Sequence, residues 1–214
     1  MSRIDGTNDG RPLGGGRFAE YDGRMKRQTA CILDGGTRDG SATNEVKQTL
    51  AELLTERGWA ATDFRLRDLD IAPCRGCFAC WVQTPGVCII DDVAREIART
   101  VAQSDLLVFL APVTFGGYSS ELKRALDRLI PLILPYFRSV GHEVHHVRRY
   151  ARCPSLLGVG LLMNPSATQE RIFQTLIERN AINMHAPRAK ASILDAGDPN
   201  SEERIAAALA EVIA

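Results

Sequence analysis

Four of the six cysteines lie between positions 74 and 88, in the pattern C-x2-C-x2-C-x7-C. Three thiolates at this close spacing can surround one corner of a cubane, and the Pro85-Gly86 turn can return a fourth. The pattern is not the ferredoxin run, because the fourth cysteine is farther away and no proline follows it. The sequence therefore offers a complete ligand set for a 4Fe-4S cluster: Cys74, Cys77, Cys80 and Cys88.

Two other interpretations of this segment stay open. Zinc also binds four thiolates, but structural zinc sites usually use two separated C-x2-C pairs, so zinc is the weaker metal interpretation. A loop of thiols, or a disulfide, without any metal is the third, since spacing shows capacity and not occupancy. Cys31 lies in an apolar run and is expected to be a buried small residue, and Cys153 an incidental thiol.

A second candidate for chemistry is the glycine-rich stretch from Gly35 to Thr43, which follows an apolar run and leads into a helical pattern. Its glycines allow close backbone approach, its threonines and Ser41 add hydroxyl donors, and Arg38 adds a cation. Together with the free amides of a helix start they form an anion site. Because the stretch has neither GKS or GKT nor G-x-G-x-x-G, a monophosphate is favoured over a nucleotide fingerprint. The alternative is a plain turn capped by Ser41.

A third candidate runs from Ala111 to Ser119. Pro112 ends a buried apolar run, the glycines Gly116 and Gly117 let backbone amides face a planar ligand, and Phe115 or Tyr118 can line its ring. The alternative is an ordinary loop between a strand and a helix.

Alternating strands and helices must position these loops. Helical spacing of apolar residues predicts helices after position 41, from Asp91, from Ser119 or Ser120, from Ser166 to Asn180 as a capping box, and from 201 to 213. Short apolar runs predict the strands between them, at 29–33, 61–67, 105–110, 156–163 and 191–194. Strands that alternate with helices form a parallel sheet covered on both faces, so we predict an α/β, doubly wound fold with five parallel strands in the order 2-1-3-4-5. In this architecture ligands bind beyond the carboxyl ends of the strands, where the loops after strands one and three lie.

These three segments together resemble the NADPH-dependent FMN reductase family of flavodoxin-like proteins, and in particular its iron-sulfur flavoprotein branch. The similarity spans residues 28–195 and rests on Gly-Gly-Thr-Arg, on Pro-Val-Thr-Phe-Gly-Gly-Tyr-Ser and on the cysteine segment between them. It implies a three-layer flavodoxin-like sandwich. One departure is Gly36, where such loops often carry a serine.

The resemblance also implies the cofactor and its contacts. The FMN phosphate is expected on Gly36, Thr37, Arg38, Ser41, Ala42 and Thr43, and the isoalloxazine on Pro112, Val113, Thr114, Phe115, Gly116 and Gly117. Because the flavin itself carries the chemistry, no catalytic side chain is named. Family members are commonly dimers or tetramers, so a homodimer or homotetramer is expected.

The composition of the chain excludes several functional classes of protein. The 214 residues carry 26 basic and 26 acidic side chains, so zero net charge disfavours a dedicated nucleic-acid binder or a binder of anionic membranes. No apolar run approaches the roughly 20 residues of a transmembrane helix. Residues 1–27 read as a flexible, glycine-rich tail without the apolar core of a secretory signal, followed by one domain from 28 to 214. Clustered cysteines without export indicate a cytoplasmic protein.

Further basic residues gather after position 137. Three histidines and four arginines there are interpreted as a solvated basic loop, with a site for the extra phosphate of NADPH or a subunit contact as alternatives. The apolar segment 132–137 just before it is a candidate subunit interface. His185 is expected to be structural or exposed, and Asp91-Asp92 to begin a helix.

From these observations we expect an FMN-dependent oxidoreductase that passes electrons from NADH or NADPH to a quinone, a flavin or another acceptor. The alternative is an iron-sulfur flavoprotein that carries electrons between protein partners without a pyridine nucleotide. Zero net charge argues mildly against a carrier, because carriers usually steer their partners with a strong field.

Overall fold

The computed structural model describes residues 27–37 and 41–214. The predicted tail, residues 1–27, lies outside the described residues except for its last position, and so does Arg38. Ser41 begins the first helix, but its side chain is not described.

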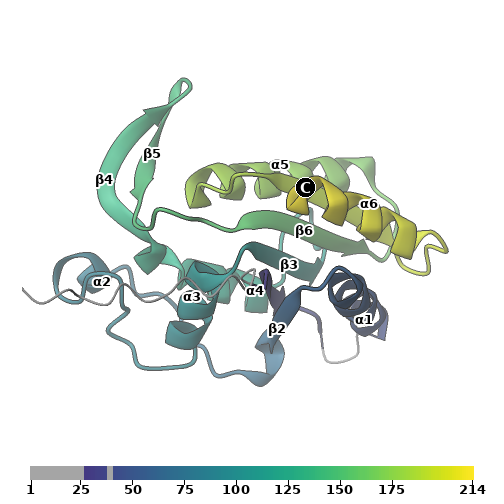
Figure 1. Ribbon diagram of the computed structural model, residues 1–214, viewed down its shortest axis with the longest axis horizontal. Helices are drawn as coiled ribbons and strands as arrows, with labels where there is room; N and C mark the ends of the chain where they lie inside the picture. Colours follow the sequence, from purple (N-terminus) through teal and green to yellow (C-terminus); the bar gives the residue numbers. More distant parts are fainter. Residues whose placement is uncertain (1–26, 38–40) are drawn as a thin grey trace, which may run out of the picture.

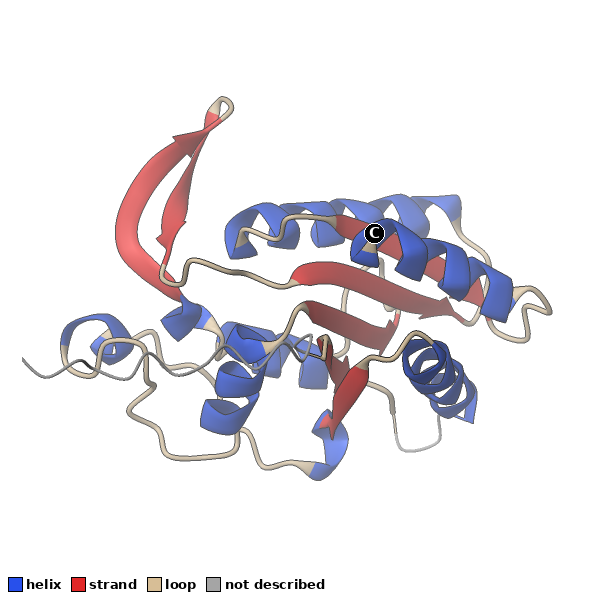
Figure 2. Cartoon of the chain, in the orientation of Figure 1, coloured by secondary structure: helices blue, strands red, loops and turns tan. Residues whose placement is uncertain are grey.

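A parallel sheet of five strands forms the centre of the described chain, in the order β2-β1-β3-β6-β7 (Figure 2). Counted within this sheet alone, that is the predicted order 2-1-3-4-5, and the predicted flavodoxin-like fold is confirmed. The strand β1 pairs in register with β3 from Ala30 opposite Leu106 to Asp34 opposite Leu110. The strands are β1 (Thr29–Asp34), β2 (Ala60–Arg65), β3 (Leu106–Pro112), β6 (Ser155–Leu162) and β7 (Ala189–Asp195).

Helices cover both faces of the sheet. In β1, Ala30 and Ile32 face one apolar cluster, while Cys31 and Leu33 face the other, because successive side chains of a strand point to opposite faces. The first cluster lies under α1 (Ser41–Glu56) and α6 (Ser201–Ile213); the second lies under α3 (Ala94–Gln103), α4 (Ser120–Asp127) and α5 (Ala167–Met184). Glycine lets α5 pack close to the sheet, since a Cβ on Gly158 would lie only 2.2 Å from Ile177 Cδ1.

A β-hairpin occupies the region predicted as an apolar segment followed by a basic loop, so the prediction of a loop was wrong. A 3-10 turn (Ile130–Leu132) leads into β4 (Ile133–Val140), which pairs antiparallel with β5 (Glu143–Arg148). The hairpin rises away from the sheet (Figure 1). Most of its side chains are half-buried or exposed, so the buried apolar run that indicates a strand is missing, and Pro135 argues further against one.

The boundaries differ from the sequence prediction in two places near the cysteines. The second strand, predicted to reach 67, ends at Arg65, and a 3-10 turn, η1 (Leu66–Asp68), follows. The helix predicted from Asp91 begins at Ala94, because Asp92 accepts a hydrogen bond from the Ala94 amide at 3.0 Å. Within the described part of the chain, no helix combines the length and apolar character needed to cross a bilayer.

Candidate functional site

The glycine loop after β1 lies directly beside the end of β3. The Gly35 amide donates to the Leu110 carbonyl at 2.8 Å, which joins this loop to the neighbouring strand. The Gly36 amide donates to Asp34 Oδ1 at 2.9 Å, in a short turn of the kind that aspartate forms with its own backbone. Parallel neighbours end at the same edge of the sheet, so the two predicted flavin loops are brought together.

Gly36 is tightly enclosed. A Cβ at this position would lie 2.7 Å from Thr43 Cγ2 and 2.9 Å from Asp34 Oδ1, closer than side chains tolerate. The serine that related loops often carry would not fit here without a shift. Glycine at 36 is therefore matched to the packing of Thr43, a buried residue of α1, and its amide is already bonded to Asp34.

Arg67 also supports this loop and was not predicted. Its Nη1 donates to the Thr37 carbonyl at 3.0 Å and to the Gly36 carbonyl at 3.4 Å. In the sequence it looked like the exposed end of an edge strand. Only the 3-10 turn after β2, which the pattern did not reveal, directs it to the loop.

The loop after β3 forms a tight turn. The amide and carbonyl of Thr114 pair with those of Gly117, at 3.2 and 2.8 Å. Both central residues have positive φ, 52° at Phe115 and 82° at Gly116, as in a type I′ turn. A phenylalanine in the left-handed region costs about 1–2 kcal/mol, and its ring is 90% exposed. Strain of this kind gathers at functional sites.

Gln169 ties this turn to α5. Ser166 caps the helix by accepting from the Gln169 amide at 3.4 Å, which is half of the predicted capping box. The side chain of Gln169 does not reach back to Ser166, because its Oε1 instead accepts from the Gly116 amide at 3.3 Å. The amides of both glycines in the turn are therefore already bonded, which corrects the prediction that they face a planar ligand. Of the two predicted aromatic residues, Phe115 is exposed, whereas Tyr118 packs against Phe109 and Phe173.

Exposed apolar side chains surround this edge of the sheet. Phe115 is joined by Met163, which follows β6 and is 73% exposed, and by Ile172 of α5, which is 40% exposed. Ile172 lies against Gly116, where a Cβ would be 2.6 Å from it. Apolar groups on three elements at a ligand-binding edge form a surface that a planar aromatic ligand can cover.

The cysteine segment folds back on itself as predicted. Cys74 and Cys77 are exposed, Cys80 is buried in the short helix α2 (Ala79–Val82), and Cys88 is half-buried. The Val87 amide donates to the Thr84 carbonyl at 2.9 Å, which closes the Pro-Gly turn, and the Gly86 amide donates to the Cys80 carbonyl at 2.9 Å, which ties the turn to α2. All four cysteines line one cavity of about 60 Å³, together with Phe78, Ile90, Arg128 and Ile130 among others.

The thiols are close enough to influence one another but are not arranged around a single ion. Burial, and then the neighbouring Cys88, Cys74 and Cys77 groups, raise the pKa of Cys80. Among the residues that the structure describes, no group of three or more metal-binding side chains is placed to hold a metal ion. Thiolates around zinc lie about 2.3 Å from the metal and must converge tightly.

A buried ion pair between Arg128 and Asp92 links the two ends of the cysteine segment. Arg128, at the end of α4, is 2% exposed and forms a bidentate pair with Asp92, at 2.7 and 2.9 Å. The same guanidinium donates to the carbonyls of Ala72 and Ile90, on either side of the cysteines. Burial disfavours the charged guanidinium, but the bonds to Asp92 and the charge of nearby Cys88 outweigh it and raise the pKa of Arg128.

The basic residues after position 137 divide into an exposed and a packed group. His145 is buried between Asn183 and Glu143, each at 2.8 Å, and Arg149 donates to the Pro131 carbonyl at 2.7 Å. His146 lies near the rings of Trp81 and Phe137, with centroids 5.0 and 4.4 Å away. These three side chains are packed against the hairpin and its neighbours, which corrects the prediction for them. The remaining four are exposed, as predicted: Arg138, His142, Arg148 and Arg152.

His185 is structural, as expected. It ends α5 in the left-handed conformation, and its Nε2 lies 2.7 Å from the His146 carbonyl.

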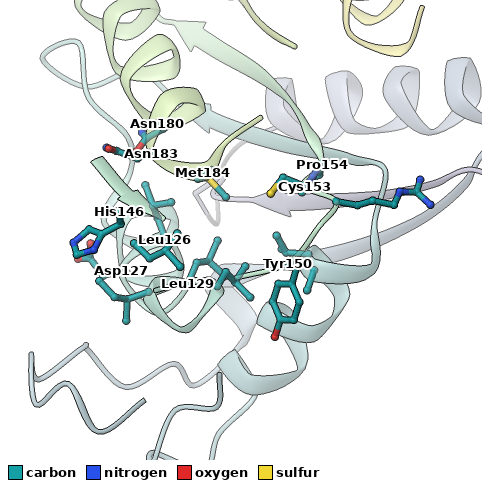
Figure 3. A pocket seen from close by; sticks show the side chains of 16 residues that line it. Leu126, Asp127, Leu129, His146, Tyr150, Cys153, Pro154, Asn180, Asn183 and Met184 are labelled. Atoms are coloured by element: carbon teal, nitrogen blue, oxygen red, sulfur yellow. The ribbon is translucent and has the colours of Figure 1, made fainter. Parts of the chain in front are cut away.

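A separate cavity of about 350 Å³ lies at the base of the hairpin, between α4 and α5 (Figure 3). Leu126, Leu129 and Met184 contribute apolar walls, and Cys153 and His146 reach its edge. Among the residues that the structure describes, neither the predicted flavin residues nor the four clustered cysteines line it.

Comparison with known proteins identifies a family and several relatives that this chain resembles. A family model described as NADPH-dependent FMN reductase matches residues 29–147. An iron-sulfur flavoprotein from Methanosarcina thermophila is 31% identical over 100 residues, which are 47% of this chain and 51% of that protein. An iron-sulfur flavoprotein from Methanocaldococcus jannaschii is 34% identical over 94 residues, 44% of this chain and 47% of that protein. The chain spans about half the length of these curated relatives.

Solved structures agree on the fold. A FMN-dependent NADH-azoreductase from Bacillus anthracis, in complex with FMN, superposes with a TM-score of 0.64 over 86% of this chain and 98% of that chain, at 12% identity. At that identity the likeness shows the fold alone. The resemblance predicted from the three loops, including its iron-sulfur flavoprotein branch, is confirmed by the family match and the curated relatives. The chain belongs to the NADPH-dependent FMN reductase family.

Proposed function

We propose that this protein is an FMN-dependent oxidoreductase that takes a hydride from NADPH or NADH and passes electrons to a quinone, a free flavin or another acceptor. The observation that carries the proposal is the meeting of two loops at one edge of the sheet, where the Gly35 amide bonds the Leu110 carbonyl. Membership of the family supports the assignment.

The residues of the first loop fit a phosphate. Gly36 lets the loop pack closely on Thr43, Thr37 and Thr43 add hydroxyls, and Arg67 holds the loop by its carbonyls. The start of α1 adds free amides and a favourable dipole for an anion. Arg38, Ser41 and Ala42 remain proposed phosphate contacts.

The residues of the second loop fit a planar ring. The segment from Pro112 to Gly117 is fixed by the Thr114–Gly117 pair and by Gln169, so it needs no reordering on binding. Phe115 and Met163 supply exposed apolar surface at the same edge. When bound, FMN supplies the hydride and electron transfer chemistry, while the protein positions it and leaves access for nicotinamide and acceptor.

A comparison of FMN affinity with riboflavin affinity tests the phosphate loop separately from the ring loop, because riboflavin lacks the phosphate. Thr43→Val keeps the shape of the side chain and removes the hydroxyl. Because a hydrogen bond to a charged group contributes about 1.5–3 kcal/mol, FMN affinity is expected to fall at least about tenfold while riboflavin affinity stays unchanged. Thr49→Val is the matched control, since Thr49 bonds only its own helix, at the Glu45 carbonyl. Equal loss for both flavins contradicts a phosphate role for Thr43.

A second candidate function is an electron carrier that holds FMN and a 4Fe-4S cluster and needs no pyridine nucleotide. The observation that favours it is the set of four cysteines around one cavity. Cys74, Cys77, Cys80 and Cys88 would bind the cluster, which when present exchanges single electrons. The buried Arg128 supports a fit, because its Nε has no hydrogen-bond partner within the described residues.

Metal content and nucleotide use distinguish the two functions. Anaerobic reconstitution with iron and sulfide, followed by chemical analysis, is expected to give about four irons per chain in the second case. A Cys77→Ser variant is expected to lose them, whereas Cys153→Ser, outside the segment, keeps them. Uptake of zinc alone, or of no metal, contradicts the cluster and leaves the flavin reductase standing.

We also propose that the protein is a homodimer or homotetramer in which the hairpin contacts a second copy. Tyr136, Phe137 and Val144 of the hairpin are 68%, 64% and 67% exposed, and an isolated two-stranded hairpin is only marginally stable in water. Tyr136→Asp with Val144→Asp is expected to give a smaller species in sedimentation analysis, and an unchanged mass contradicts the hairpin contact. The six unpaired thiols support a reducing, cytoplasmic location.

A further inference from the structure

Arg128 has one hydrogen-bond donor that the protein does not use. A guanidinium carries five N–H donors. The two on Nη1 reach Ala72 O and Asp92 Oδ2, and the two on Nη2 reach Ile90 O and Asp92 Oδ1. The fifth, on Nε, is buried and has no partner among the described residues. Buried donors without acceptors are rare, so each points to an acceptor that remains to be identified.

The position of this side chain indicates what the acceptor is. Arg128 lines the same cavity of about 60 Å³ as the four cysteines. Cys88 lies near the guanidinium, and its charge contributes to the raised pKa of Arg128. Among the described residues that line this cavity none is a carboxylate, and the cysteine sulfurs are its only side-chain acceptors.

The other four bonds hold the guanidinium in place. They fasten it to residues on both sides of the cysteine segment, and the Ala72 amide adds a bond to Asp92 Oδ2 at 3.0 Å. A donor fixed in this way keeps its direction when the charge of its acceptor changes, which is the condition for electrostatic preorganisation.

We propose that the Nε–H of Arg128 donates a hydrogen bond to a sulfur atom on the Cys88 side of the 4Fe-4S cluster and thereby raises its reduction potential. This inference rests on the cluster of the second candidate function. Reduction adds one electron to the cluster and breaks no bond, so the sulfurs become more negative and the hydrogen bond strengthens. Hydrogen bonds to cluster sulfurs are among the factors that set the potential.

A potentiometric titration of the reconstituted protein with dithionite, followed by electron paramagnetic resonance, tests the proposal. Arg128→Lys keeps the positive charge near Asp92 and removes the Nε donor. The ratio of reduced to oxidised cluster at a given potential is expected to fall about tenfold, equal to a midpoint about 59 mV lower for one electron. Arg124→Lys is the matched control, since Arg124 is exposed one turn earlier on α4. A midpoint in Arg128→Lys equal to that of the control overturns the proposal.

A measurement with Arg128 intact covers the case in which Arg128→Lys does not fold. Arginine labelled with ¹⁵N in the guanidinium group is incorporated into a chain carrying Arg75→Lys, which removes the other arginine of the cavity. A hyperfine coupling from ¹⁵N to the reduced cluster is expected. A second sample that also carries Arg95→Lys identifies any contribution from Arg95, whose Nε donates to the Cys88 carbonyl. If the second sample shows no hyperfine coupling, the proposal is overturned.

Iron and sulfide analysis distinguishes a failure of the proposed role of Arg128 from a failure of the proposed cluster. A protein that takes up neither iron nor sulfide contradicts both the cluster and the role of Arg128. A protein that holds a full cluster without the potential shift or the coupling contradicts the role of Arg128 alone.

Discussion

Asp92→Asn is expected to destabilise the protein strongly, although it changes one atom of a side chain. The carboxylate of Asp92 is 15% exposed and its partner Arg128 only 1%. Removing one partner of a buried ion pair leaves the other charge uncompensated, which costs about 3–5 kcal/mol. This is a large part of the 5–15 kcal/mol or so that stabilises a typical domain.

The neighbouring Asp127 provides a matched control. It pairs with Lys123 at 2.6 Å, but both side chains are about half exposed, at 46% and 58%. Exposed pairs at this helical spacing contribute about 0.3–0.5 kcal/mol. Asp127→Asn is the same chemical change, so the contrast isolates the burial of the pair and its contacts with the cysteine segment.

Urea unfolding followed by circular dichroism measures the difference. With an m value of about 2–3 kcal/mol/M, Asp92→Asn should lower the midpoint by about 1–2.5 M and Asp127→Asn by less than about 0.3 M. Equal midpoints for the two variants would refute the reasoning, because Arg128 would then not depend on Asp92.

The same pair predicts a pH dependence. Burial opposes the Asp92 carboxylate, but hydrogen bonds from Arg128 and from two backbone amides outweigh it and lower the pKa of Asp92. A carboxyl with a lowered pKa in the folded state contributes stability above its unfolded pKa, near 3.9, and loses it as the pH falls through the folded pKa. The difference between wild type and Asp92→Asn should therefore shrink below about pH 4; a constant difference to lower pH contradicts it.

Three further results are expected. Gly36→Ala should weaken FMN binding at least about tenfold in a fluorescence titration, because its Cβ would lie 2.7 Å from Thr43 Cγ2; unchanged affinity would contradict the enclosed loop. Hydrogen bonds from Arg179 and His145 lower the pKa of Glu143 to about 2, so carbon NMR should show Arg179→Gln moving that pKa upward, and no movement would contradict the pairing. Burial raises the pKa of Cys31 to about 12, so mass spectrometry after alkylation at pH 8 should find the exposed cysteines modified and Cys31 intact; early modification of Cys31 would show that the sheet opens.

The main sheet could be predicted because its strands are continuous apolar runs. Leu106 to Leu110 is fully buried, as the run indicates. The same holds for Leu156 to Leu162, in which the glycines are also buried. The hairpin could not be found in this way, because its stability depends on side-chain contacts such as that of His146 with Trp81, 65 positions earlier in the chain.

The loops of the candidate site could be predicted from the sequence, but the side chains that hold them in place could not. The two loops after β1 and β3 meet where the doubly wound topology requires. Arg67, Gln169 and Arg128 were missed because their partners lie 30, 53 and 56 residues away. Arg128 in particular follows a helical apolar pattern, where a buried cation carries no local signal.

The most direct test of the central claim is an anaerobic titration of the FMN-loaded protein with NADPH and with NADH, followed by visible absorption. The chain is expected to take up FMN, and one of the two nucleotides is expected to bleach its absorption bands, with full recovery when a quinone is added. A chain that binds no FMN, or bound FMN that neither nucleotide reduces, would contradict a hydride-accepting flavin enzyme.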